Sequence, residues 1–321
     1  MISYAQNWED VVLARVFAGQ STGRYVDIGA CDPVEDSVTK HFYDIGWRGI
    51  NIEPLPVKAD QLRAARPEDT TLQVAVGAEP GKATLHVVND GLGRSTLDGE
   101  LAGQYREDQH WQVEDLEVEV VTLAEVLDEH PGAVDFLKID VEGAEQDVIE
   151  GAAWDRHRPR VLVVEATAPG VPTPTYGGWE PVLLDSGYRC VLFDGLNRFY
   201  AQADDADAVE ALSAPANVFD EFEPYAVVRL REELARQPSV RAAEVGYVRR
   251  LEERLREAQQ ARAQDVEYIK TLEEAVAAER HRATKAARYA AALESRVAEL
   301  TASRNVPPPA EVTPREKQDP A

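Results

Sequence analysis

Three carboxylates beside or within short apolar segments are the residues best suited to do chemistry. Asp27 lies in YVDI, and Asp140 and Glu165 close FLKID and VLVVE. Open α/β sheets bind ligands at the carboxyl ends of their strands, near the point where the strand order reverses. In the usual order 3-2-1-4-5 these three strands are neighbours. The pattern therefore predicts that three carboxylates converge on one rim.

A cation is needed among these acids, because crowded carboxylates raise one another's pKa. Lys138, a divalent metal or a cationic ligand could each supply the charge. Lys138 lies inside FLKID, where burying an unpaired ammonium is costly, so we expect it to pair with one of the acids. Asp140 and Glu165 could also share Mg²⁺, which prefers oxygen ligands.

The turn after the first strand favours a ligand without phosphate. DIGACDP, from Asp27 to Pro33, has one early glycine, whereas a dinucleotide site needs more glycines around its pyrophosphate. Asp32 would also repel phosphate. S-adenosylmethionine fits this description, because it combines an adenosine with a positive sulfonium and an amino acid end.

Four positions near this turn are candidate cofactor contacts. Asp27 would face the ammonium of the cofactor directly or through water, and Gly29 and Ala30 would let the backbone come close. Glu53 ends the second strand, where a carboxylate can accept both ribose hydroxyls. Simpler interpretations stay open, in which Gly29 only serves a tight turn and Glu53 is a loop acid.

Other segments could complete or cover the site. The segment APGVPTPTYGG, residues 168–178, leaves the fifth strand at the same rim and is either a lid or a connector. Ser95 and Arg94, in the polar loop 89–99, are candidate contacts for cofactor or acceptor. An N-terminal segment either closes over the cofactor or begins a surface helix; it contains Gln6, Glu9 and Asp10.

Alternating apolar and helical segments predict the elements that position these residues. The expected buried strands are Tyr25–Ile28, Gly49–Glu53, Leu72–Val76, Phe136–Asp140 and Val161–Glu165. The expected helices are Val34–Ile45, Pro56–Ala65, Leu123–Glu129 and Gly143–Ala153. Added or edge strands are expected at Thr84–Val88 and Leu116–Val121, and a closing hairpin at Tyr188–Phe193 and Arg198–Ala201. Together they predict a seven-stranded, doubly wound α/β sheet.

Several longer motifs together resemble one known family. They are SYAQNWEDVVLARVF (3–17), YVDIGACDP (25–33), SVTKHFYDIGWRGINIEP (37–54), FLKIDVEGAEQDVIEG (136–151) and RPRVLVVEA (158–166). These motifs are similar to the FkbM family of S-adenosylmethionine-dependent methyltransferases over roughly Ser3 to Asp220. DGLNRFY (194–200) and PANVFDEF (215–222) further resemble members associated with bacterial surface polysaccharides.

The resemblance implies a Rossmann-like class I methyltransferase fold and assigns roles to particular positions. The cofactor contacts would be Asp27, Gly29 and Glu53. The motif around the reacting centre would be Lys138, Asp140, Glu142, Gly143 and Glu145. Many relatives have DIGANxG where this chain has DIGACDP, so Cys31 and Pro33 depart from the pattern.

Methyl transfer to a hydroxyl needs a group that takes the acceptor proton. Asp140 is the first choice, with Glu165 assisting or sharing Mg²⁺. In an alternative interpretation Asp140 caps a helix that begins near Gly143, while Glu142 and Glu145 are first-turn acids. The expected function is O-methylation of a sugar hydroxyl on a glycan or glycosylated metabolite. The alternatives are a nicotinamide-dependent dehydrogenase or epimerase, and a non-catalytic coiled-coil scaffold.

Charge and cysteine content limit the partners. The 321 residues carry a net charge of −24, and Met1–Val228 holds 42 acidic against 16 basic residues, which disfavours binding to nucleic acid. Two cysteines, with no signal peptide and no apolar run long enough for a membrane span, indicate a cytoplasmic protein.

The composition divides the chain into three parts. Residues 1–228 form the expected methyltransferase domain, 229–304 a long helical coiled coil, and 305–321 a disordered, proline-rich tail. Apolar residues recur at steps of three and four in the second part. We expect this part to make the protein a homo-oligomer, the alternative being a hairpin that folds back on itself.

Overall fold

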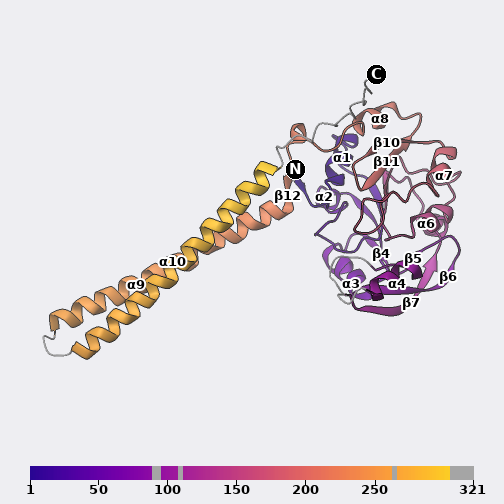
Figure 1. Cartoon of the computed structure of the whole chain (residues 1–321). Coiled ribbons are helices and arrows are strands. Elements are labelled where there is room, and N and C mark those ends of the chain that lie inside the picture. The colour runs from indigo at the N-terminus through magenta and orange to yellow at the C-terminus, as the bar shows by residue number, and fades with distance from the viewer. Residues whose placement is uncertain (89–94, 108–110, 262–265, 304–321) are drawn as a thin grey trace, which may run out of the picture. The chain divides into compact units, whose positions relative to one another are not determined.

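Seven strands form the central sheet of the unit Met1–Phe222 (Figure 1). Across the sheet they are β10 (Tyr188–Phe193), β11 (Asn197–Gln202), β9 (Val161–Glu165), β8 (Phe136–Ile139), β2 (Arg24–Ile28), β3 (Arg48–Ile52) and β4 (Thr70–Leu72). The five strands from β9 to β4 are parallel, and β11 is antiparallel to both neighbours. The computed structural model describes residues 1–88, 95–107, 111–261 and 266–303. The predicted order 3-2-1-4-5 and the closing hairpin are confirmed.

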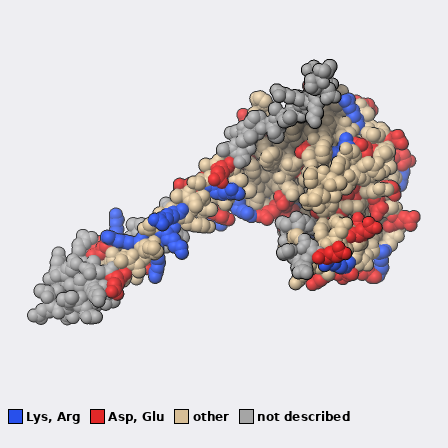
Figure 2. Space-filling view, in the orientation of Figure 1, with Lys and Arg blue, Asp and Glu red and all other residues tan. Residues whose placement is uncertain are grey.

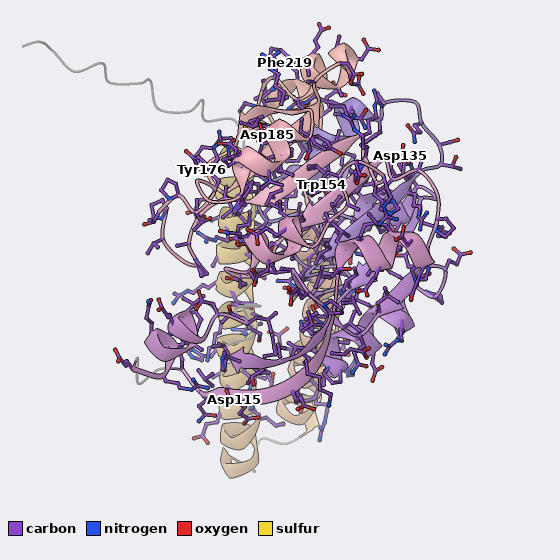
Figure 3. All side chains as sticks on the ribbon, turned by 90° about the vertical axis from the view of Figure 1, so that its right-hand side faces the viewer. Asp115, Asp135, Trp154, Tyr176, Asp185 and Phe219 are labelled. Carbon is purple, nitrogen blue, oxygen red and sulfur yellow. The ribbon has the colours of Figure 1, made fainter. Side chains whose placement is uncertain are left out.

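A smaller sheet beside the main one corrects the prediction for Leu72–Val76. That segment is two strands, because β4 ends at Leu72 and β5 (Ala75–Val76) pairs with β7 (Val113–Val121). β7 also pairs with β6 (Gly81–Val88), which gives the order β5-β7-β6. An apolar run looks the same whether it forms one strand or two, so the break left no sequence signal. Asp115 of β7 and Phe219, in the 3₁₀-helix Val218–Asp220, lie at opposite ends of this unit (Figure 3).

Short helices cover both faces of the main sheet, and α4 (Gly99–Glu107) packs on β6 and β7 of the smaller sheet. The helices of the main sheet are α1 (Glu9–Val16), α2 (Lys40–Asp44), α3 (Pro56–Ala65), α5 (Leu123–Glu129), α6 (Glu145–Glu150), α7 (Glu180–Asp185) and α8 (Ala206–Ala211). Alternate strand residues face opposite layers. Val26 and Leu137 share a core with α5, α6 and α7, while Tyr25 and Phe136 share one with α1, α2 and α8.

Two helices are shorter than predicted, while α3 and α5 have the predicted bounds. The prediction Val34–Ile45 contracts to α2, and Gly143–Ala153 contracts to α6. Asp36 and Gly143 have φ angles of 56° and 103°, in the left-handed region that interrupts a helix. Asp36 is not a glycine, so the sequence did not mark the first interruption, whereas the second lies at a glycine.

Two long helices, α9 (Tyr225–Ala261) and α10 (Val266–Ser303), form most of the unit Glu223–Ala321 and lie side by side as a hairpin (Figure 1). Leu251, Leu272 and Val276 are buried, and Arg280 forms an ion pair with Glu252. This is the alternative arrangement, a hairpin that folds back on itself, because the same apolar period suits one long helix and two helices that pack on each other. Self-association through this unit stays a prediction.

The remaining elements of the described chain are minor. β1 (Ile2–Ser3) and β12 (Glu223–Pro224) have two residues each. The tail predicted at 305–321 lies outside the described residues. Among the described residues, no helix is long and apolar enough to cross a membrane.

A buried polar chain lies beneath the carboxyl ends of the central strands. Arg66 is 1% exposed and donates hydrogen bonds of 2.6 Å to Thr39 Oγ1, Ser37 Oγ and Pro33 O. Thr39 Oγ1 in turn donates to Asp27 Oδ2 at 2.8 Å. Both terminal nitrogens of the buried guanidinium thus find acceptors, whereas its Nε has none among the described residues. This chain ties the loop before α2 to the last turn of α3.

We predict that Arg66→Leu destabilises the protein by about 2–4 kcal/mol, because three buried acceptors lose a charged donor. Chemical denaturation of both proteins measures the difference. Arg63→Leu is the matched control: this arginine lies in α3, is half exposed, and forms an ion pair with Asp60 and a long hydrogen bond with Gln73, so a loss of about 0.5 kcal/mol or less is expected. Equal losses in the two variants would contradict the prediction.

The carboxylate of Glu9 is buried at the start of α1. Asn197 Nδ2 donates to its Oε1 at 2.6 Å, and the backbone N–H of Asn7 donates to its Oε2 at 2.9 Å. Burial, reinforced by the nearby charge of Asp194, raises the pKa of Glu9 from 4.5 to about 8. The N-terminal segment is therefore attached to β11 through a carboxyl that keeps its proton near neutral pH.

This raised pKa makes stability depend on pH. Between about pH 4.5 and pH 8 the unfolded chain has released a proton that the folded chain keeps, so the free energy of unfolding falls as pH rises. Glu9→Gln removes this contribution, which has a slope of at most about 1.4 kcal/mol per pH unit. The stability of the variant relative to wild type should therefore rise from pH 5 to pH 8 in denaturant titrations. The exposed Glu129→Gln should show no such trend, and a flat difference for Glu9→Gln would refute the prediction.

Candidate active site

A cavity of about 1000 Å³ opens at the carboxyl ends of β2, β3, β8 and β9. Its floor includes Gly29, Glu53, Asp140 and Glu165, which come from four neighbouring strands. The small sheet contributes an apolar wall that contains Leu85, Val87 and Val88. A cavity of this size, apolar on one side and acidic on the other, has room for a cofactor and a second molecule.

Lys138 links the two central strands below the cavity. Asp27 and Lys138 are paired residues of the parallel strands β2 and β8, and their side chains point to the same face. Lys138 Nζ lies 3.6 Å from Asp27 Oδ1 and 3.2 Å from Asp140 Oδ2, and donates to Gly29 O at 3.4 Å. Although burial disfavours the ammonium, the two carboxylates raise the pKa of Lys138. The expected pairing of Lys138 with one acid is thus a pairing with two.

Asp27 itself does not line the cavity. Its side chain is buried, and its partners are Thr39 and Lys138. The expectation that Asp27 faces the cofactor ammonium directly therefore does not fit the geometry. Asp27 lies behind Lys138 and holds that ammonium, which in turn holds Asp140.

Asp140 and Glu165 form a carboxyl pair at the cavity. The side chain of Asp140 is 31% exposed, whereas Glu165 is 8% exposed. Burial, with the charges of Asp140 and Glu142, strongly raises the pKa of Glu165, which also shares a hydrogen bond with Asp140. Glu165 Oε2 has no hydrogen-bond partner among the described residues. Burial therefore favours the protonated form of Glu165, while Asp140 forms an ion pair with Lys138.

The turn after β8 is clamped from two sides. Glu142 and Gly143 both have positive φ angles, of 54° and 103°. Glu145, buried in the first turn of α6, accepts hydrogen bonds from the backbone N–H groups of Val141 and Gly143 at 3.1 and 3.2 Å. Thr96 Oγ1 donates to Glu142 O at 2.6 Å. These bonds fix a tight turn directly after Asp140.

The helix-capping interpretation of Asp140 is wrong. The N-cap of α6 is Ala144, without a side-chain cap, so the carboxylate of Asp140 is left to the cavity. Glu145 is a first-turn acid, as that interpretation expected, and it holds the turn. Burial raises the pKa of Glu145.

The glycine after β2 serves close packing between strand ends. Gly29 has a φ of 80°, and a Cβ there would lie 1.7 Å from the carbonyl oxygen of Asp140. Its N–H and that of Ala30 donate to Ile52 O at 3.0 and 3.2 Å. Gly29 and Ala30 both line the cavity. The turn thus faces the cavity, while its two backbone N–H groups donate to the last residue of β3.

Glu53 lines the cavity at the end of β3 and is 5% exposed. Its Oε2 accepts from the backbone N–H of Cys31 at 2.9 Å, and its Oε1 from that of Leu55 at 2.8 Å. Burial raises the pKa of Glu53. Because each carboxylate oxygen has two lone pairs, both oxygens can accept one further hydrogen bond from a ligand.

The loop between β6 and α4 contributes one predicted residue and one that the sequence did not reveal. Ser95 lines the cavity, and its Oγ accepts from the backbone N–H of Val88 at 3.3 Å. Arg94 lies outside the described residues. Thr96 is fully buried and bonds to Glu142, as described above. Only the non-local contact distinguishes Thr96 from Ser95, so sequence reasoning missed it.

Two further segments reach the rim of the cavity. Residues 168–172 line it, and a bridge between Thr167 and Pro174 closes this loop at its base. Gln6 also lines the cavity, whereas Glu9 and Asp10 are buried away from it. Whether residues 168–178 act as a lid stays a prediction.

The residues do not fit a divalent metal. Lys138 already supplies the positive charge next to Asp140, at 3.2 Å from its Oδ2. Within the described residues, no group of three or more His, Cys, Asp or Glu side chains is arranged to hold a metal ion. The proposed mechanism therefore does not use Mg²⁺.

Two solved structures are similar to this chain. A TehB-like SAM-dependent methyltransferase from Corynebacterium glutamicum ATCC 13032 Kitasato is 11% identical, with a TM-score of 0.34 over 60% of this chain and 87% of that one. A precorrin-6y C5,15-methyltransferase from Geobacter metallireducens GS-15 is 14% identical, with a TM-score of 0.32 over 61% and 87%. These scores are too low to carry an argument. A comparison with curated proteins found no match.

The family described as the methyltransferase FkbM domain matches residues 27–190, just over half of the chain. The matched segment contains the end of β2 and all of β3, β8 and β9, and with them the floor of the cavity. This match overturns the nicotinamide-dependent alternative and favours an enzyme over a silent scaffold. The chain therefore belongs to the FkbM methyltransferase family and is an S-adenosylmethionine-dependent methyltransferase.

Proposed function

We propose that the enzyme methylates a sugar hydroxyl on a glycan or glycosylated metabolite, with Asp140 as the proton acceptor. The observation that carries this proposal is the carboxyl arrangement at the strand ends. Asp140 is partly exposed to the cavity, with the ammonium of Lys138 behind it and the protonated Glu165 beside it. This arrangement keeps one carboxylate charged and accessible among several acids.

The residues present fit S-adenosylmethionine. Glu53 offers two carboxylate oxygens, each with a free lone pair, which suits the two hydroxyls of a ribose. Gly29 and Ala30 supply a close backbone surface, and the apolar wall of Leu85 and Val87 suits an adenine ring. Ser95 lies at the edge of this wall. When bound there, S-adenosylmethionine supplies an electrophilic methyl group on a positively charged sulfur.

Asp140 performs the proton transfer in the proposed mechanism. The acceptor hydroxyl gives its proton to a carboxylate oxygen of Asp140 while the oxygen–methyl bond forms and the sulfur–methyl bond breaks. Lys138 holds Asp140 in place through its 3.2 Å contact. Glu165 stays neutral and orients Asp140 through their shared hydrogen bond. Positioning in a cavity that excludes bulk water supplies much of the rate.

The turn between β10 and β11 supports a saccharide acceptor. Gly195 and Leu196 line the cavity and belong to DGLNRFY (194–200), the motif that resembles polysaccharide-associated members. Asp194 Oδ1 accepts from the backbone N–H groups of Leu196 and Asn197 at 2.8 and 2.6 Å. The motif thus builds a fixed wall next to the carboxyl pair.

Two substitutions separate chemistry from cofactor binding. We predict that Asp140→Asn lowers kcat by about 10²-fold or more, because the proton acceptor is lost, while the Kd for S-adenosylhomocysteine changes by less than about threefold.

We predict that Glu53→Gln raises the Kd for S-adenosylhomocysteine by about tenfold, since one ribose acceptor becomes a donor. Calorimetry and release of S-adenosylhomocysteine measure the two effects. Wild-type turnover by Asp140→Asn would exclude the proposed base.

Thr96 gives a test of positioning. We predict that Thr96→Val lowers kcat by about tenfold with little change in the KM for S-adenosylmethionine, because the carbonyl of Glu142 loses its donor. Thr96→Ser keeps the hydroxyl and should retain wild-type kcat. If Val and Ser variants are equally impaired, the hydroxyl does not position the turn.

A further inference from the structure

We propose that the acceptor sugar enters this cavity without a phosphate group, so that methylation follows the glycosyl transfer that releases the sugar from its nucleoside diphosphate. This inference rests on the proposed function and specifies its substrate class. Three properties of the cavity carry it: the sign of its charge, the partners of its cations and the partners of its backbone amides.

The charge of the cavity lining is strongly negative. The acidic residues that line it are Asp32, Glu35, Asp36, Glu53, Asp140, Glu142 and Glu165. Among the described residues of the lining, only Lys58 and Lys138 oppose them. Burial raises the pKa of Glu53 and of Glu165, and even without these two the remaining acids outnumber the lysines. A diphosphate would add further negative charge to an acidic space.

Both lysines are already committed to carboxylates. Lys58 Nζ lies 3.3 Å from Asp32 Oδ2, and Lys138 Nζ lies 3.2 Å from Asp140. Binding a phosphate through either lysine would leave a carboxylate facing that phosphate. On the visible surface of the unit Met1–Phe222, red acidic side chains are more frequent than blue basic ones, whereas blue lysine and arginine side chains gather along α9 and α10 (Figure 2).

The backbone amides that usually bind phosphate are occupied as well. At the turn after β2, the N–H of Cys31 donates to Glu53. The N–H groups of Val34 and Glu35 donate to Asp32 at 2.9 and 3.0 Å. At the turn after β8, Glu145 takes two amides in the same way. A carboxylate of the chain thus fills the position that a phosphate would take in a phosphate-binding turn.

A neutral sugar suits this lining better than an activated one. Its hydroxyls are donors, and the carboxylates around the cavity are acceptors. A nucleotide-activated sugar loses its nucleoside diphosphate when a glycosyltransferase joins it to another hydroxyl. The chemistry of this cavity therefore places methylation after that step.

Paired probes test the inference. The full-length enzyme is incubated with S-adenosylmethionine and with glucose, galactose, N-acetylglucosamine or rhamnose, each offered as the nitrophenyl glycoside and as the nucleoside diphosphate sugar. Mass spectrometry detects the gain of a methyl group on each probe. We expect kcat/KM for the glycoside to exceed that for the matching nucleotide sugar by at least about tenfold. Equal or faster methylation of the nucleotide sugars would overturn the inference and leave the proposed function standing.

Methylation of no probe in either form would count against the proposed function itself, and the inference would fall with it. Glu35→Lys adds an independent readout, because it places a cation on the exposed rim. In Glu35→Lys the ratio of kcat/KM for the glycoside to kcat/KM for the nucleotide sugar should fall by several-fold. In the neutral control Glu35→Gln this ratio should fall less. An unchanged preference in Glu35→Lys would show that charge does not set the selectivity.

Discussion

The contact of Lys138 with two carboxylates is the interaction on which the site depends. The parallel register of β2 and β8 places Asp27 and Lys138 side by side, and Asp140 follows directly after the end of β8. Without the ammonium, two carboxylates and the neighbouring Glu165 would lie together in a space of low polarity. Lys138 therefore offsets the repulsion among these carboxylates, so that the strand ends that carry them can stay folded.

The polar chain below the sheet extends this constraint in the opposite direction. Arg66 contacts Thr39, Thr39 contacts Asp27, and Asp27 contacts Lys138. Charges of opposite sign are thus connected from the end of α3 to the floor of the cavity. On the other side, Glu145 and Thr96 hold the turn that follows Asp140. The carboxylate that we assign to catalysis is therefore held from below and from above.

The sequence predicted the parts of this structure that follow from local pattern. Buried parallel strands appear as apolar runs, so the order of the five central strands and the convergence of Asp140 and Glu165 could be inferred, whereas Asp27, the third acid of that prediction, does not line the cavity. Contacts between segments that are far apart in the sequence could not be inferred. The bond from Thr96 to Glu142 spans 46 residues, and the withdrawal of Asp27 below the floor depends on Thr39. The reversal between α9 and α10 likewise leaves the apolar period unchanged, so one helix and two give the same pattern.

The missing side chain at position 29 couples two parts of the enzyme that chemistry would treat as separate. The turn after β2, which we assign to the cofactor, touches the main-chain carbonyl of Asp140, the proposed proton acceptor, at Gly29. There is no room for a methyl group between them. Any enlargement here would push apart the donor and acceptor halves of the reaction before it altered either binding surface. Redesign of the binding surface on one side of Gly29 therefore requires changes on the other side as well. The glycine is needed for these strand ends to pack together, as well as for recognition of a nucleoside.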